Sequence, residues 1–272
     1  MSRLDETFAD LRTRRRTGLV TYVTAGDPDL DRSALVLRAL DRAGADVLEL
    51  GVPFSDPVAD GPVIERAAER ARAAGGTLTS TLDLIGRTRP AIRAPIVLFT
   101  YVNPLLAMGE RVFADRAAAV GVDGVLVLDL PVEEAGGFRA TLTSAGIDMV
   151  FLISPTTTDQ RIKRAAALGR GFLYVISRLG VTGARDTLPV GAREVVARVR
   201  AHTTLPVGVG FGLSRPEHVR QVGAWADAAV VGSALVSVVA KAAGSPDFVA
   251  RIEHYVRWLK GADVETARTD QP

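Results

Sequence analysis

The sequence predicts an α/β protein built as a single (β/α)8 barrel, and three observations favour that fold. Eight short apolar runs recur along the 272-residue chain. These runs are nearly continuous rather than alternating, which is typical of parallel strands buried on both faces. Amphipathic helical stretches lie between them, as a barrel requires. We expect the barrel to occupy residues 1–261 and a frayed tail to follow at 262–272.

The expected strands follow one another along most of the chain. They are 18–26, 46–53, 95–102, 124–131, 148–154, 171–177, 206–212 and 228–235. Between them, apolar residues spaced three and four apart predict helices, and several of these end in a glycine that suits a helix C-terminus. Examples are 32–44, 110–121 and 159–169. The last helix, at 247–261, places Ile252, Tyr255, Val256 and Leu259 on one face.

A doubly wound sheet is the alternative fold. It is disfavoured because the strand count is eight and because no nucleotide-binding fingerprint is present. The segment GVGFGL at 208–213 does not fit GxGxxG, and no Gly-Lys-Ser/Thr loop occurs.

Composition excludes several classes of protein. The formal net charge is +2, from 33 basic and 31 acidic residues, so no broad nucleic-acid footprint is expected. The run RTRRR at 12–16 indicates a solvated helix end, with a polyanion contact as the alternative. The absence of cysteine excludes disulfides, thiolate metal sites and thiol nucleophiles. The N-terminus is charged and no apolar run is long enough to span a membrane, so we expect a cytoplasmic protein.

Two carboxylates lie where a barrel carries its chemistry, at the carboxyl ends of the strands. Glu49 falls inside the apolar run 46–53, and the period of two points it to the same side as Val47 and Gly51. If that side is the barrel interior, burial raises its pKa toward that of a general acid or base. A buried ion pair with an arginine is the alternative. Asp60 follows on a Pro/Gly-rich segment, where a helix N-cap is the alternative role.

Glycines at the last three strand ends predict an anion site. They occur in GVTGAR at 180–185, FGLS at 211–214 and VGSAL at 231–235, the last placed in the eighth strand and the turn after it. Backbone N–H groups of glycine turns and a helix N-terminus bind phosphate without a lysine. Phosphate-binding barrels use the loops after strands seven and eight.

The positions of lysine and histidine narrow the chemistry further. A Schiff-base mechanism needs a lysine at a strand end, and a metal-dependent aldolase needs clustered histidines. All of these residues fall in helices or before a strand: Lys163, Lys241, Lys260, His202, His218 and His254. We therefore expect no metal site, and acid–base chemistry by carboxylates on a phosphorylated substrate.

The segment LELGVPFSDPVADGP at 48–62 closely resembles the signature of tryptophan synthase α subunits. Further segments are similar to that family in the same order. They are 21–29, 101–109, 121–134, 176–185, 207–217 and 230–236. The resemblance implies reversible retro-aldol cleavage of indole-3-glycerol phosphate to indole and glyceraldehyde 3-phosphate. Protonation of the indole ring at C3 would supply the electron sink.

The resemblance also implies roles for individual residues. Glu49 would move the proton between the glycerol hydroxyl and C3, and Asp60 would accept or stabilise the indole N–H. The matched phosphate positions are Gly183, Gly212, Gly232 and Ser233. The matched indole-pocket positions are Tyr22, Phe99, Tyr101, Leu126, Tyr174 and Phe211, each with ordinary barrel core as the alternative, above all Phe99 and Leu126. Segments 53–60 and 178–190 resemble loops that close over substrate.

The family works as an α2β2 complex that passes indole to a β subunit carrying pyridoxal phosphate. By this resemblance the chain itself binds no cofactor, and the interface positions are Asp56, Pro57, Asn103 and Pro131. Indole-glycerol-phosphate synthase and phosphoribosyl-anthranilate isomerase are disfavoured, because the first would need a catalytic lysine and the second a cysteine. A catalytically silent subunit that activates a β partner is disfavoured by Glu49 and Asp60. A stand-alone indole-releasing lyase stays open.

Overall fold

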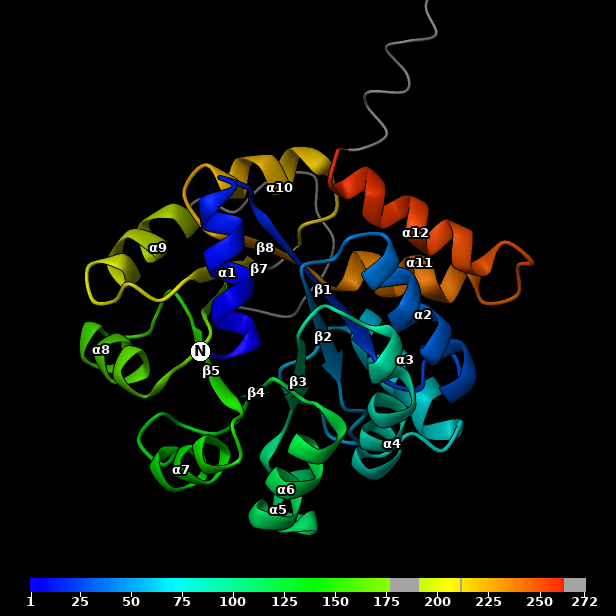
Figure 1. The fold of residues 1–272 in the computed structure, drawn as a ribbon, viewed down its shortest axis with the longest axis horizontal. Helices are drawn as coiled ribbons and strands as arrows, with labels where there is room; N and C mark the ends of the chain where they lie inside the picture. Colours follow the sequence, from blue (N-terminus) through cyan, green and yellow to red (C-terminus); the bar gives the residue numbers. More distant parts are fainter. Residues whose placement is uncertain (177–190, 211, 262–272) are drawn as a thin grey trace, which may run out of the picture.

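The computed structural model describes residues 1–176, 191–210 and 212–261. Eight parallel strands form a closed barrel in chain order (Figure 1). The strands are β1 Gly18–Thr24, β2 Val47–Gly51, β3 Ile96–Thr100, β4 Gly124–Val127, β5 Asp148–Ile153, β6 Leu173–Ile176, β7 Val207–Gly210 and β8 Ala228–Val231. Each lies within one of the expected runs, so the predicted (β/α)8 barrel is confirmed.

All helices but the first surround the barrel on its outer side, and the first lies across one end of it (Figure 1). The helices are α1 Arg3–Thr13, α2 Leu30–Arg42, α3 Pro62–Ala73, α4 Leu78–Thr88, α5 Val102–Met108, α6 Glu110–Val120, α7 Gly136–Ser144, α8 Asp159–Leu168, α9 Ala192–Arg200, α10 Pro216–Gly223, α11 Ser233–Ala242 and α12 Phe248–Leu259, with a 3-10 turn η1 at Arg89–Ala91. No helix in the described ranges is both long and apolar enough to cross a membrane. Residues 262–272, the expected tail, lie outside the described residues.

One end of the barrel is closed by α1, which lies across the end at which the strands begin (Figure 1). Leu4, Phe8 and Leu11 of this helix are buried and pack against the inward side chains of the strands. Burial of these three side chains stabilises the closure by about 2 kcal/mol each. Side chains therefore fill the barrel interior at the end where the strands begin, and open space is left at the end where the strands finish.

Strand alternation sorts the side chains into two layers. In β2, Leu48 and Leu50 point outward into the core beneath the helices, whereas Val47 points inward. Glu49 is paired with Tyr22 on β1 and with Val97 on β3. The inward direction expected for Glu49 follows from this alternation.

The predicted eighth strand was too long. Strand β8 ends at Val231, and Ser233 is the first residue of α11 rather than part of a strand or turn. The apolar run continues past the strand because Leu235, Val236 and Val239 form the buried face of the helix. A continuous apolar run does not show where a buried strand gives way to a buried helix.

Candidate active site

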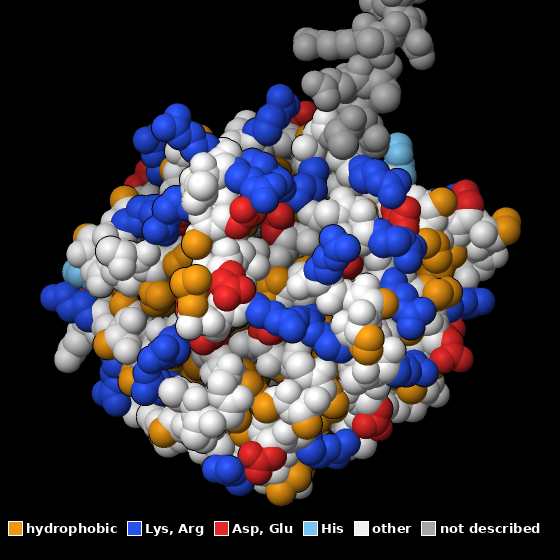
Figure 2. Space-filling view, in the orientation of Figure 1, with side chains coloured by type: hydrophobic (Ala, Val, Ile, Leu, Met, Phe, Trp, Pro, Cys, Tyr) orange, Lys and Arg blue, Asp and Glu red, His pale blue; other side chains and the backbone are white. Residues whose placement is uncertain are grey.

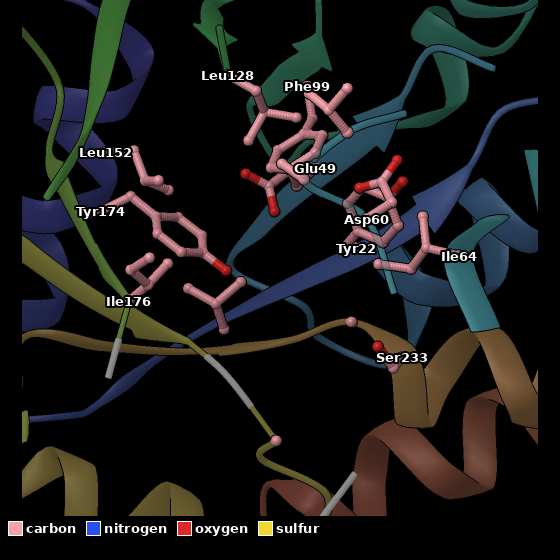
Figure 3. A pocket seen from close by; sticks show the side chains of 15 residues that line it. Tyr22, Glu49, Asp60, Ile64, Phe99, Leu128, Leu152, Tyr174, Ile176 and Ser233 are labelled. Carbon is pink, nitrogen blue, oxygen red and sulfur yellow. The ribbon is translucent and has the colours of Figure 1, made fainter. Parts of the chain in front are cut away.

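A cavity of about 330 Å³ opens at the carboxyl ends of the strands (Figure 3). Eight of the residues singled out from the sequence line it: Tyr22, Glu49, Asp60, Phe99, Tyr174, Gly212, Gly232 and Ser233. The remaining lining is mostly apolar and was not anticipated: Val58, Ala59, Ile64, Leu128, Leu152, Ile176 and Val230. The cavity therefore combines an apolar wall with two carboxyl groups and a small polar end.

Glu49 projects from the middle of β2 into this cavity, and its side chain points between Tyr174 and Tyr22 (Figure 3). Only 1% of the residue is exposed, and its Oε1 atom has no hydrogen-bond partner among the described residues. Burial raises the pKa of this carboxyl to about 8. No arginine of the described ranges pairs with it. The alternative of a structural ion pair therefore finds no support among the residues that the structure describes.

Asp60 lies at the edge of the same cavity, directly before α3. It is 7% exposed, and burial raises its pKa to about 6, an effect partly offset by hydrogen bonding with Tyr101. The N-cap of α3 is Gly61, which makes no side-chain capping bond. The alternative role of Asp60 as the N-cap is therefore wrong, and its carboxylate remains available to the cavity.

The two carboxyl groups face different environments, and their pKa values differ accordingly. At neutral pH, Glu49 with a pKa of about 8 is mostly protonated, while Asp60 with a pKa of about 6 is mostly ionised. One cavity thus holds a carboxyl group that keeps its proton and a carboxylate that is ionised. Pairs of carboxyl groups separated in this way are how one site supplies both an acid and a base.

The polar end of the cavity is the start of α11. Ser233 is its first residue and Gly232 its N-cap, which provides no side chain to satisfy the first-turn N–H groups. Such N–H groups, together with the helix dipole, attract an anion. Gly212 faces the same cavity with a φ of +79°, a backbone conformation that favours glycine. Gly183, the fourth predicted phosphate contact, lies outside the described residues.

Aromatic rings form the side walls. Tyr22 and Phe99 meet edge to face with ring centroids 5.2 Å apart. Tyr22 lies against Gly51, where a Cβ atom would come within 2.6 Å of the ring carbon Cζ. Tyr174 lies in the same way against Gly210, at 2.9 Å.

The role of these two glycines was not predicted from the sequence. They stand at inward positions of β2 and β7, and the absence of a Cβ atom leaves room for the phenol rings. The signal that would have found them is a glycine at an inward strand position near a predicted tyrosine.

Two predicted pocket residues do not line the cavity, and a third is not described. Leu126 is fully buried in the inner barrel core and does not line the cavity, so the core alternative holds for it. Its place in the wall is taken by Leu128, which lies one inward step nearer the mouth. Tyr101 lies behind the wall, where its hydroxyl accepts a hydrogen bond from Ala59 N–H at 3.2 Å. Phe211 lies outside the described residues.

The four predicted interface residues follow β2, β3 and β4 at the same end of the barrel as the cavity. Asp56, Asn103 and Pro131 are exposed and Pro57 is partly exposed. None of them lines the cavity. Of the two predicted loops, 53–60 is described and 178–190 lies outside the described residues.

The charged groups of the cavity are carboxyls. Among its lining residues in the described ranges there is neither a lysine nor a histidine. In those same ranges no three His, Cys, Asp or Glu side chains are grouped as metal ligands.

The fold and the site together define a (β/α)8-barrel protein of the enzyme type, with a cavity at the carboxyl ends of its strands that is lined by two buried carboxyl groups and the N-terminus of a helix. Comparison with known proteins gives the family. The family model for the tryptophan synthase alpha chain matches residues 8–263. The chain therefore belongs to the tryptophan synthase alpha chain family.

Individual relatives agree with this membership. The tryptophan synthase alpha chain of Solibacter usitatus is 46% identical, over 96% of this chain and 97% of its own length. The tryptophan synthase alpha chain of Methylococcus capsulatus is 50% identical, over 91% of this chain and 93% of its own length. The crystal structure of the alpha subunit from Legionella pneumophila has a TM-score of 0.88 at 33% identity, covering 97% of this chain and 99% of that one. A structure of Mycobacterium tuberculosis tryptophan synthase has a TM-score of 0.87 at 36% identity, covering 96% and 97%.

Proposed function

We propose that the cavity is the site where this chain cleaves indole-3-glycerol phosphate to indole and glyceraldehyde 3-phosphate, with Glu49 as the proton-transfer group. Its family makes the chain a carbon–carbon lyase of tryptophan biosynthesis. The observation that supports the mechanism is the Glu49 carboxyl, which is buried, has no ion-pair partner among the described residues and lines a mostly apolar cavity.

The first step uses the proton that Glu49 retains at neutral pH because its pKa is about 8. The carboxyl gives this proton to C3 of the indole ring, and the ring becomes an iminium that withdraws electrons. The Glu49 carboxylate then takes the proton of the hydroxyl on the carbon attached to the ring. The bond between that carbon and C3 breaks, the carbon becomes the aldehyde of glyceraldehyde 3-phosphate, and the electron pair returns to the ring. The net change is one proton moved from the hydroxyl to C3.

Asp60 stabilises the charged ring during this sequence. Its carboxylate is ionised at neutral pH, since its pKa is about 6. A hydrogen bond from the indole N–H to this anion strengthens as the ring becomes positive, so Asp60 acts mainly in the transition state. Tyr101 holds the segment before Asp60 through its hydrogen bond from Ala59 N–H, 3.2 Å long.

The substrate spans the cavity from the aromatic walls to the start of α11. Indole lies among Tyr22, Phe99 and Tyr174, and the phosphate lies at Gly212, Gly232 and Ser233. The helix N-terminus and the Ser233 hydroxyl neutralise the dianion without a cationic side chain. This orientation places the bond that breaks near Glu49.

A tryptophan synthase β subunit is the partner, in an α2β2 assembly in the cytoplasm. The interface includes Asp56, Pro57, Asn103 and Pro131, accompanied by Val58 and Leu106, whose exposed fractions are 82% and 57%. Large apolar side chains exposed beside an active-site mouth favour a protein contact. Pyridoxal phosphate acts only in the β subunit, and no cofactor acts in this chain. The whole chain from 1 to 261 forms one catalytic domain.

The test is indole release from indole-3-glycerol phosphate, measured with and without a β subunit and repeated in heavy water. Turnover that places one solvent deuterium at C3 of indole, and that is lost in Glu49→Gln, supports the proposal. The absence of turnover under both conditions would mean a silent subunit. Fast turnover unaffected by a β subunit would mean a stand-alone lyase.

A further inference from the structure

A second cleft lies at the opposite end of the barrel from the active cavity. It has a volume of about 480 Å³ and lies between the end of α1 and the segment that leads into β8. Its charged lining consists of Arg12, Arg15, Arg16, Arg200 and Asp227, and its aromatic lining of Phe8 and Trp225. Figure 2 shows Lys and Arg side chains gathered on this face, where α1 ends near α10.

Positive charge in this cleft is only partly neutralised. Arg200 pairs with Asp227 at 2.9 Å, and Arg16 pairs with Asp46 at 3.4 Å. The side chains of Arg12 and Arg15 form no ion pair or hydrogen bond with any residue of the described ranges. The chain as a whole carries a net charge of only +2, so this concentration of guanidinium groups is local. Two such groups without carboxylate partners attract an anion with more than one negative charge.

Arg15 occupies a backbone position that disfavours it. Helix α1 ends in a Schellman motif, in which Arg16 N–H bonds to Leu11 C=O at 2.9 Å and Arg15 N–H to Arg12 C=O at 3.1 Å. In this motif the residue that follows the helix C-cap, here Arg15, must adopt the left-handed conformation, and glycine is the usual residue at that position. Arg15 has a φ of 53° and is the one non-glycine residue with positive φ in the described ranges.

An arginine at such a position costs stability that a glycine would not. Strained residues of this kind persist where their side chain has a use. In this conformation Arg15 lines the cleft, as does Arg12 three residues earlier in the chain.

We propose that this cleft binds a polyphosphate anion, with Arg12 and Arg15 as its principal ligands. Guanidinium groups bind phosphate oxygens in pairs, and a chain of phosphates reaches from Arg12 and Arg15 toward Arg200. Trp225 is partly buried and lines the cleft, so a flat group bound there would contact it. Two kinds of ligand contain such a phosphate chain, an inorganic polyphosphate and a nucleoside polyphosphate.

The test uses tripolyphosphate and ATP as probes at low ionic strength. The protein has two tryptophans, so a Trp258→Phe background leaves Trp225 as the only indole fluorophore. Titration of its fluorescence gives the affinity at this cleft rather than at the active cavity. Tighter binding of ATP than of tripolyphosphate assigns a nucleoside source, and equal or weaker binding assigns an inorganic one.

Matched variants locate the site. Arg12→Gln and Arg15→Gln should each weaken binding about five- to tenfold. Arg14→Gln removes the same charge from the neighbouring residue, which pairs with Asp10 and does not line the cleft, and should change the affinity less than twofold. Equal weakening in Arg14→Gln, or no binding of either probe below millimolar concentration, would overturn the proposal.

A glycine substitution separates folding from binding. Arg15→Gly should raise the midpoint of urea unfolding, because glycine suits the left-handed position, and should weaken tripolyphosphate binding as much as Arg15→Gln does. Indole release should stay unchanged in this variant, because the cleft lies at the other end of the barrel. A variant that binds tripolyphosphate as tightly as the parent would show that Arg15 is not a ligand.

Discussion

Replacing Glu49 with glutamine should make the protein inactive and, at neutral pH, more stable. Glu49 is 1% exposed, and its pKa is raised from 4.5 in the unfolded chain to about 8 in the folded chain. The folded protein therefore holds a proton that the unfolded chain releases. Stability falls as the pH rises from about 4.5 and stops falling above about 8. Glutamine is neutral throughout, so the variant avoids this loss.

The magnitude follows from the two pKa values. Integrated between pH 5 and pH 7, the proton linkage of one such carboxyl amounts to roughly 2 to 3 kcal/mol. The free energy of unfolding of Glu49→Gln minus that of the parent should therefore increase by roughly 2 to 3 kcal/mol over this interval. The cost of burying the amide is the same at both pH values and cancels in this comparison.

Two assays check this prediction. Urea unfolding of both proteins at pH 5 and pH 7 gives the stability difference, and indole release gives the activity, which should fall by about 10² to 10⁴. Glu134→Gln, at an exposed glutamate, is the control. Its free energy of unfolding relative to the parent should be the same at pH 5 and pH 7. A stability difference for Glu49→Gln that is the same at both pH values would refute the reasoning, because it would mean that Glu49 is ionised in the folded protein.

Three further predictions follow from the same site. The pH profile of kcat/KM should rise through about 6 as Asp60 ionises and fall through about 8 as Glu49 loses its proton; a flat profile from 5.5 to 8.5 would contradict these assignments. Ser233→Ala should raise KM about tenfold with little change in kcat, since it removes a hydrogen bond to the phosphate in ground and transition state alike; steady-state kinetics measure this, and a selective loss of kcat would contradict it. Gly51→Ala should lower indole release at least about tenfold, because its Cβ would meet a tyrosine ring carbon at 2.6 Å, whereas Gly244→Ala, with no atom within 4 Å, should leave activity unchanged.

The strands were predictable because each is buried on both faces and therefore nearly continuous in apolar residues. The residues at which the strands end were less predictable, as the boundary between β8 and α11 shows. At Ser233 the same apolar character continues into a helix, and only the change of period marks the boundary.

The inward direction of Glu49 also followed from the sequence, since alternation in one strand needs no knowledge of the other strands. The depth at which each inward side chain lies along the barrel axis could not be predicted from the sequence. Leu126 and Leu128 both belong to the inward side of the fourth strand region, yet only Leu128 lines the cavity. Which layer meets the cavity depends on the stagger between strands, and that is a property of the closed barrel.

Contacts between side chains of neighbouring strands could not be predicted from the sequence either. Room for Tyr22 and Tyr174 depends on glycines of β2 and β7, whose positions relative to the rings follow from the strand register. For Asp60, the local sequence suited a helix N-cap as well as a cavity residue, and the choice depended on Gly61 taking the cap. In each case the missing information was tertiary.

The most direct measurement is a ¹³C NMR titration of the Glu49 side-chain carboxyl, assigned by the loss of its resonance in Glu49→Gln. We expect a single midpoint near 8, with the carboxyl protonated at pH 7. A midpoint below about 5, typical of an exposed glutamate, would contradict the claim that Glu49 enters the reaction as the acid.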